Sequence, residues 1–195
     1  YNKNIMANNV YTTMSIESSK EVLKNFVDMI ITPEVEEADW HEKSYIVGNN
    51  LYKLIYDNYP AEYSRDWNTQ NLGAKWCFLH DWLIEDDVIE LTFESAWYPP
   101  DELFHEIANW FIKRGEFEME ARSEDEAYQN VSGGYANQNG SEFIVEDMDI
   151  PEWPDEDKFD TTELYDEAME TFYDEIIELK ENLINESKED LSIYP

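Results

Sequence analysis

The beginning of the chain changes from strand-like to helix-like spacing of apolar side chains. Residues 10–16 are rich in β-branched side chains and predict a strand. Across 22–30, apolar residues recur at helical spacing, Ser18 or Ser19 can cap this helix, and Pro33 ends it. A strand followed by a helix is therefore expected first.

The next stretch has weaker patterns. We interpret residues 34–45 as irregular because they are acidic and lack a clear period, 49–58 as a short helix, and 61–72 as a loop. Together they form an insertion at about 33–70, between the first helix and the strands that follow.

A hairpin and a helix come next, joined by the octapeptide FESAWYPP. Strands are predicted over 75–84 and 88–97, with three acidic residues between them as the hairpin turn. A helix is predicted over 101–113, because the two prolines of the octapeptide favour a helix start. In this interpretation the octapeptide is a structural joint, with Phe93 and Trp97 as core residues.

The remaining strands are predicted downstream of this helix. Strict alternation indicates a strand over 116–122, and weaker strands over 127–131 and 142–145 flank a Gly/Asn-rich turn at 133–140. The order of elements is typical of an α+β fold, a ferredoxin-like antiparallel sheet with helices on one face, plus an acidic C-terminal helix.

The C-terminal part separates from this domain by composition. The domain is expected over 6–149, a Pro-rich acidic linker over 150–159, and an acidic amphipathic helix over 160–195, packed on the domain or extending from it. Thr161 or Thr162 can cap the helix. Its apolar stripe has helical spacing and consists of Tyr165, Ala168, Phe172, Ile176, Leu179 and Leu183.

Composition adds a packed core and an unusual charge. Of 195 residues, 42% are hydrophobic and 15% aromatic, which indicates a folded chain. The formal net charge is −33, so the protein should repel nucleic acids and anionic membranes and attract basic surfaces. The single cysteine, Cys77, excludes an internal disulfide and a cysteine-based zinc cluster. With no signal-peptide pattern and no apolar run near ~20 residues, a cytoplasmic location is expected.

Three segments resemble one family. MANNVYTTMSI at 6–16, NLGAKW at 71–76 and LTFESAWYPPDELFHEIA at 91–108 are similar to phage- and plasmid-encoded proteins with the YubB-type (Api-like) ferredoxin-like domain. The chain departs from the family's pattern at Ala74 and Ser95, where the family usually has threonine. The resemblance implies a ferredoxin-like fold and a phage or mobile-element setting, which places the protein in the cytoplasm of a host cell. It implies no site residues.

Catalytic and cofactor motifs are weak. Ser95 could act as a nucleophile with His80 or His105 as base, but no motif places these side chains together. The acidic segment 146–160 lacks the spacing of an EF-hand loop, and the chain has no phosphate-binding loop. We therefore predict no enzyme activity, no catalytic residues, no metal site and no cofactor.

The acidic residues concentrate towards the C-terminus. Residues 116–195 hold 26 acidic and 4 basic residues, a net charge of −22, against −11 for 1–115. Carboxylates recur every three or four residues along the C-terminal helix, comparable with phosphates along a nucleic-acid strand. The predicted partner-binding residues of the helix are Glu163, Glu167, Glu170, Asp174 and Glu178. A second predicted patch consists of Glu146, Asp147, Asp149, Trp153, Asp155, Glu156 and Asp157.

These features favour a DNA or RNA mimic. Such a protein would inhibit a host nucleic-acid-binding defence complex, of the restriction or CRISPR type, by occupying its basic channel. The predicted partner is thus a basic host protein or complex, with no direct contact to nucleic acid or membrane. The alternatives are a merely solvated acidic face and a non-enzymatic protein–protein adaptor, in which the sheet or the C-terminal helix makes the contact, including in a homodimer.

Overall fold

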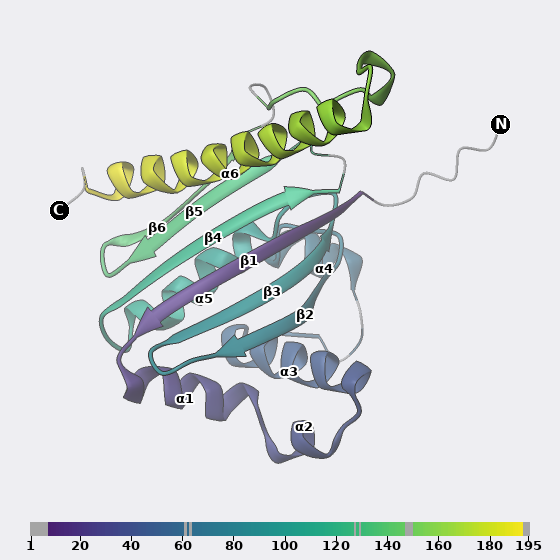
Figure 1. Cartoon of the computed structure of the whole chain (residues 1–195). Helices are drawn as coiled ribbons and strands as arrows, with labels where there is room; N and C mark the ends of the chain where they lie inside the picture. The colour runs from purple at the N-terminus through teal and green to yellow at the C-terminus, as the bar shows by residue number, and fades with distance from the viewer. Residues whose placement is uncertain are drawn as a thin grey trace.

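The fold is a six-stranded antiparallel sheet with helices on both faces (Figure 1). The computed structural model of the chain describes residues 8–60, 62, 64–126, 128, 130–146 and 150–192. The strands are β1 (Asn9–Ser18), β2 (Cys77–Ile84), β3 (Val88–Ala96), β4 (Phe117–Asp125), β5 (Val131–Asn137) and β6 (Gly140–Glu146). The helices are α1 (Lys20–Ile30), α2 (Pro33–Glu37), α3 (Trp40–Ile55), α4 (Arg65–Asn71), α5 (Asp101–Ile112), the short η1 (Glu156–Lys158) and α6 (Thr162–Ser192).

The strands are ordered β2-β3-β1-β4-β5-β6, and every neighbouring pair is antiparallel. Strand β3 lies between β1 and β2, and β1 lies between β3 and β4, so two βαβ units interleave. The hairpin of β5 and β6 extends this sheet beyond β4. The predicted α+β class with an antiparallel sheet and a long C-terminal helix is confirmed, whereas the finer ferredoxin-like assignment stays a prediction.

Helices α1, α3 and α5 bury one face of the sheet (Figure 1). The alternating strands supply fully buried Met14 and Ile16 from β1 and Phe93 from β3, which pack against Phe26 of α1 and Phe111 of α5. Every second residue of each strand points to this side, so the opposite face is left for polar side chains and α6.

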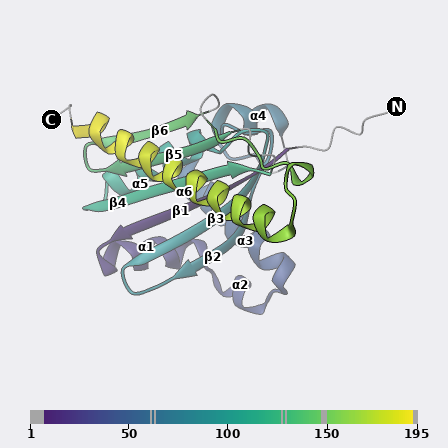
Figure 2. The same ribbon diagram turned by 45° about the horizontal axis from the view of Figure 1, so that its top comes forward.

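Helix α6 packs on the opposite face, over β4, β5 and β6 (Figure 2). It forms a second core, in which Phe172, Ile176 and Leu183 bury against Val131 of β5. The predicted apolar stripe of the helix is therefore used within the chain. At its start, the backbone N–H of Leu164 donates to the Thr161 hydroxyl over 3.3 Å, which is the expected N-cap.

Two glycines at the centre of β5 permit this double-sided packing. A Cβ on Gly133 would lie 2.7 Å from Cβ of Leu183 and 2.8 Å from the backbone N of Ile184, both in α6. A Cβ on Gly134 would lie 2.6 Å from the Phe143 ring on the other face. The prediction of a turn over 133–140 is wrong for this reason, because these glycines serve close packing in a strand and the turn is confined to Gln138 and Asn139.

The insertion at about 33–70 is mostly helical, which corrects its interpretation as irregular chain and loop. Helix α3 begins at Trp40, and its cap Asp39 accepts from the backbone N–H of Glu42 over 3.0 Å. Helix α4 is capped in the same way by Ser64, which accepts from Trp67 N–H over 3.3 Å. Both caps are Asp/Ser signals that the acidic composition of the segment had obscured.

The joint FESAWYPP is structural, as expected, except at Trp97. Ser95 is fully buried and its hydroxyl donates to the carbonyl of Tyr98 over 2.8 Å. Trp97 adopts a φ of 74° and is 40% exposed, so the prediction that it is a core residue is wrong. The left-handed backbone reverses the chain here and turns the indole away from the core beneath Phe93.

Candidate acidic partner surface

The predicted carboxylates of α6 lie together on the outward side of the helix. Glu163, Glu167, Glu170, Asp174 and Glu178 are all exposed. At about 100° per residue they fall within a sector of about 80°, opposite the stripe that buries Phe172 and Ile176. We call these five residues the outward stripe.

The lysines of α6 reach the sheet. Lys180 Nζ lies 2.5 Å from Glu124 Oε2, and Lys188 Nζ lies 2.7 Å from Glu120 Oε1, both on β4. Arg122 of β4 completes the row, with Nε 2.8 Å from Glu181 Oε1 of α6. The cations are thus used to fasten the helix to the sheet, and from Glu163 to Glu178 the helix has no lysine or arginine.

These contacts perturb the ionisation of the groups on β4. Partial burial would raise the pKa of Glu120, but hydrogen bonds and charge from Lys188 and Arg122 outweigh it, and the net pKa is lowered. Burial would likewise lower the pKa of Arg122, but the hydrogen bonds that it donates to Glu181 and Glu120, and the charge of these carboxylates, raise it. Both groups are therefore held in their charged forms.

The carboxylates of the second predicted patch lie on different elements and differ in their contacts. Asp155 lies beside η1, where it accepts from the Asp157 backbone N–H over 3.3 Å and faces Lys158 at 3.9 Å. Glu156 and Asp157 are exposed on the same short helix, and Glu146 ends β6. Asp147 and Asp149 lie outside the described residues.

Trp153 anchors this segment to α6. Its ring lies 5.1 Å from that of Phe172 and 5.6 Å from that of Tyr128, while 49% of the residue stays exposed. Tyr173 joins the same aromatic cluster, with its ring 5.6 Å from that of Phe172. The segment therefore lies against the N-terminal half of α6, so the second patch begins beside the outward stripe.

A third group of carboxylates was not singled out from the sequence. Glu17 of β1, Glu90 and Glu94 of β3, and Glu118 of β4 alternate with buried residues and so share the sheet face that carries α6. Glu17 and Glu118 are directly opposite each other. Their alternation with apolar residues was the available signal.

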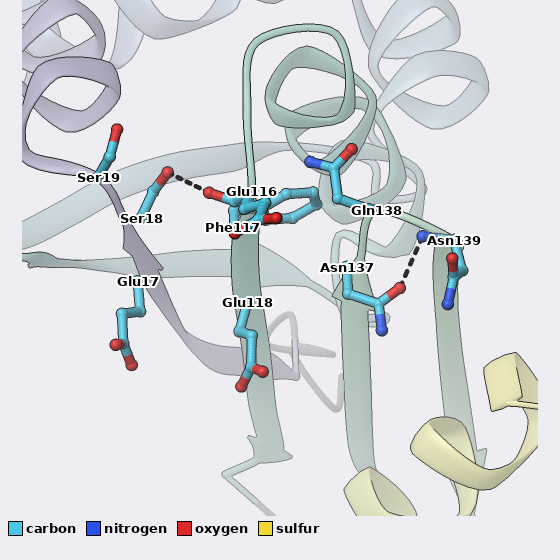
Figure 3. A pocket seen from close by; sticks show the side chains of 9 residues that line it. All are labelled: Glu17, Ser18, Ser19, Glu116, Phe117, Glu118, Asn137, Gln138 and Asn139. Atoms are coloured by element: carbon cyan, nitrogen blue, oxygen red, sulfur yellow. Dashed lines mark hydrogen bonds between the residues drawn. The ribbon is translucent and has the colours of Figure 1, made fainter.

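An open cavity of about 710 Å³ lies at the end of the sheet where β1 and β4 meet the β5–β6 turn (Figure 3). Glu17 and Glu118 point to the same side of it, and the Ser18 hydroxyl donates to the Glu116 carbonyl over 2.7 Å. The Asn137 side chain accepts from the backbone N–H of Asn139 over 2.8 Å. The Ser18 hydroxyl and the Asn137 amide oxygen are thus used in hydrogen bonds to the backbone at this end of the sheet.

The residues weighed for chemistry are scattered. His105 Nδ1 lies 2.8 Å from the Ser141 hydroxyl, and His80 is exposed on β2, so neither faces Ser95. Burial raises the pKa of the Cys77 thiol to about 12, which keeps it protonated. Within the described residues, no group of three or more His, Cys, Asp or Glu side chains could hold a metal ion, and no helix is long and apolar enough to cross a membrane.

Comparisons with known proteins give one distant structural likeness. No protein-family model matches the chain, and no curated protein matches it. A crystal structure of a protein api92 from Yersinia pseudotuberculosis, of the DUF1281 family, is similar with a TM-score of 0.41 and 7% sequence identity. The match covers 71% of this chain and 98% of that one. A likeness this distant carries no argument about function, and the YubB-type resemblance stays a prediction.

Proposed function

We propose that this chain is an acidic phage or mobile-element protein that inhibits a nucleic-acid-binding defence complex of a host, of the restriction or CRISPR type, by DNA or RNA mimicry. The observation that carries the proposal is the separation of charge on α6. Its lysines are paired with β4, whereas the outward stripe presents carboxylates alone.

The geometry of the stripe suits a phosphate-binding surface. From Glu163 to Glu178 the helix rises about 22 Å, at about 1.5 Å per residue. Successive carboxylates are about one turn, ~5.4 Å, apart, comparable with the spacing of phosphates along one strand. Lysines and arginines that hold a nucleic-acid backbone could therefore contact several of these carboxylates at once.

The stripe also has a cost for the free protein. Glu163 and Glu167, and Asp174 with both Glu170 and Glu178, are like-charged pairs four residues apart. Each such pair destabilises a helix by about 0.2–0.5 kcal/mol. A soluble domain needs far less charge than −33. A surface that binds a polycation gives the stripe a use that solubility alone does not.

For the adaptor alternative, the sheet is a more accessible contact surface than the apolar stripe of α6. Phe172, Ile176 and Leu183 of the α6 apolar stripe are buried within the chain, so a partner could reach them only by displacing the helix. Within the described residues, α6 packs over β4, β5 and β6 and leaves the sheet face over β1, β2 and β3 accessible. A sheet-mediated adaptor would depend on this face and be indifferent to the outward stripe.

Amide substitutions test the proposal more cleanly than truncation, because deleting 160–195 would also expose the second core. The variant carries Glu163→Gln, Glu167→Gln, Glu170→Gln, Asp174→Asn and Glu178→Gln. The matched control removes five exposed carboxylates elsewhere: Glu21→Gln, Glu34→Gln, Glu37→Gln, Asp57→Asn and Glu102→Gln. Each protein is used to capture partners from a bacterial lysate at low salt.

The expected result is that the wild type and the control retain the same nucleic-acid-binding complex and the stripe variant loses it. Since both variants have the same net charge, retention by the stripe variant would refute mimicry by α6. Loss by both variants would show that net charge alone matters.

A further inference from the structure

Helix α6 covers only half of its sheet face. It packs on β4, β5 and β6, and Figure 1 shows no helix of the described part of the chain in front of β1 and β3 on that side. The outward side chains there form cross-strand rows, with Tyr11 opposite Glu94 and Ser15 opposite Glu90. Tyr11 is 41% exposed although it lies at the middle of a six-stranded sheet.

The uncovered width corresponds to one helix. From β5, beneath α6, to β1 is two strand spacings, or about 10 Å. Packed helices lie about 8–10 Å apart, axis to axis. A second helix laid over β1 would therefore contact the sheet and the side of α6 together.

Apolar side chains of α6 face this gap. Tyr173, Ile177 and Lys180 follow at intervals of four and three residues and so share one side of the helix. Lys180 on that side pairs with Glu124 of β4, so this side of α6 faces from β5 towards β4 and β1. Ile177 is 54% exposed and Tyr173 42%.

The gap has a net negative charge, because Arg122 and Lys180 at its border are each paired with a carboxylate. Strands β1, β2 and β3 contain no lysine or arginine. Their carboxylates Glu17, Glu90 and Glu94 form no ion pair within the described residues.

We propose that this gap is a docking trough for a basic amphipathic helix of a partner protein. The trough consists of Tyr11, Thr13, Ser15, Glu90, Thr92, Glu94, Tyr173 and Ile177. The apolar side of the incoming helix packs on Tyr11 and Ile177, and its lysines and arginines pair with Glu90 and Glu94. The proposal deepens the proposed function, on which it rests for the basic character of the partner.

The occupant is a helix because the sheet disfavours an added strand at its nearer edge. The carbonyls of Cys77 and His80 on β2 accept from the hydroxyls of Tyr52 and Ser44, both over 3.0 Å. Strand β2 also has an irregular register between Leu79 and Asp81. Both features block continuous pairing along that edge, whereas the trough lies on the face.

The test uses a synthetic peptide of about 18 leucines and lysines, about five helical turns, with the leucines on one side. The control peptide has the same composition with the leucines shuffled. Affinity is measured by fluorescence anisotropy on the full chain. The trough variants are Tyr11→Ser with Ile177→Ser, and Glu90→Gln with Glu94→Gln. Their controls are Met29→Ser with Leu164→Ser, which are exposed elsewhere, and Glu34→Gln with Glu37→Gln, which lie outside both proposed surfaces.

The amphipathic peptide should bind at least about tenfold more tightly than the shuffled one, and each trough variant should lose about tenfold, as for an interface anchor. The controls should bind as the wild type does, and circular dichroism should show all variants folded. No binding, equal binding of both peptides, or equal loss in the controls would overturn the proposal. A dimer in sedimentation that the trough variants dissolve would also overturn it, by giving the trough to a second copy. Because the peptide replaces the partner, the two experiments are independent. Failure of the peptide to bind would refute the trough without refuting mimicry, and failure of the capture experiment would refute mimicry by α6 without refuting the trough.

Discussion

Gly133 has no side chain at the point where α6 lies closest to the sheet. The atoms that an added Cβ would meet belong to Leu183, Ile184 and Lys180, and two of the three are backbone atoms that cannot rotate away. The sequence shows only a Gly-Gly pair, which is as typical of a turn as of close packing. The sequence alone therefore assigns these glycines to a turn, and only the position of α6 explains why they lie in a strand.

Replacing Gly133 should separate α6 from the sheet. Gly133→Ala is expected to destabilise the protein by about 1–3 kcal/mol, the usual cost of overpacking. Gly115→Ala is the control, because its Cβ would meet only the Val22 side chain, at 3.3 Å. Urea denaturation of both variants measures the difference. Equal stabilities would mean that the helix is not seated on Gly133.

The decrease in the free energy of unfolding at acidic pH should depend on Glu120. Its pKa is lowered in the folded state by Lys188 and Arg122 against the effect of burial. Its contribution is therefore fully present above the ordinary glutamate pKa, about 4.3, and is lost as the pH falls through the lower folded value. Glu120→Gln should be less stable than the wild type at neutral pH, and the gap should close with acid.

The control for this titration is Glu178→Gln, which removes an exposed carboxylate of the outward stripe. Its stability relative to the wild type should not fall at neutral pH. If the Glu120 variant keeps the same deficit from neutral to acidic pH, the ion pairs to α6 contribute nothing to stability.

At the scale of elements, strongly periodic segments were predictable. The alternation of β1 and β4 and the helical stripes of α1, α5 and α6 specify their own type because each buries one side. Helix α3 was missed at its acidic start, since local composition hides a cap such as Asp39. The pairing of Lys180 with Glu124 joins residues 56 positions apart, and no local pattern encodes it.

Neutralising the outward stripe should stabilise α6. Asp174 has a like charge four residues away on each side, Glu170 and Glu178. Asp174→Asn removes both repulsions and should raise the free energy of unfolding by about 0.5 kcal/mol at low salt. Asp57→Asn, an exposed position outside the helices, should change it little. If Asp174→Asn lowers the free energy of unfolding, the Asp174 carboxylate stabilises the helix, and the like charges of the outward stripe do not destabilise it as proposed.

At the scale of the whole molecule, the basic side chains of the acidic C-terminal part are used in ion pairs. Beyond residue 115 the described cations are Arg122, Lys158, Lys180 and Lys188, and each is paired with a carboxylate. The face with α6 is thus left with unpaired carboxylates on the helix and on the open strands. The spacing of the outward stripe is present in the sequence, but the grouping of Glu17, Glu90 and Glu94 on one sheet face could be found only once the order of the strands was known.

Nucleic-acid competition on the captured host complex tests the central claim most directly. Wild-type protein is bound to the complex, and duplex DNA or RNA is titrated in at fixed low salt, then at increasing salt. Mimicry predicts that the nucleic acid displaces the protein, and that affinity falls steeply with salt as several contacts to lysine and arginine are screened. Simultaneous binding of protein and nucleic acid, with an affinity that hardly changes with salt, would contradict it.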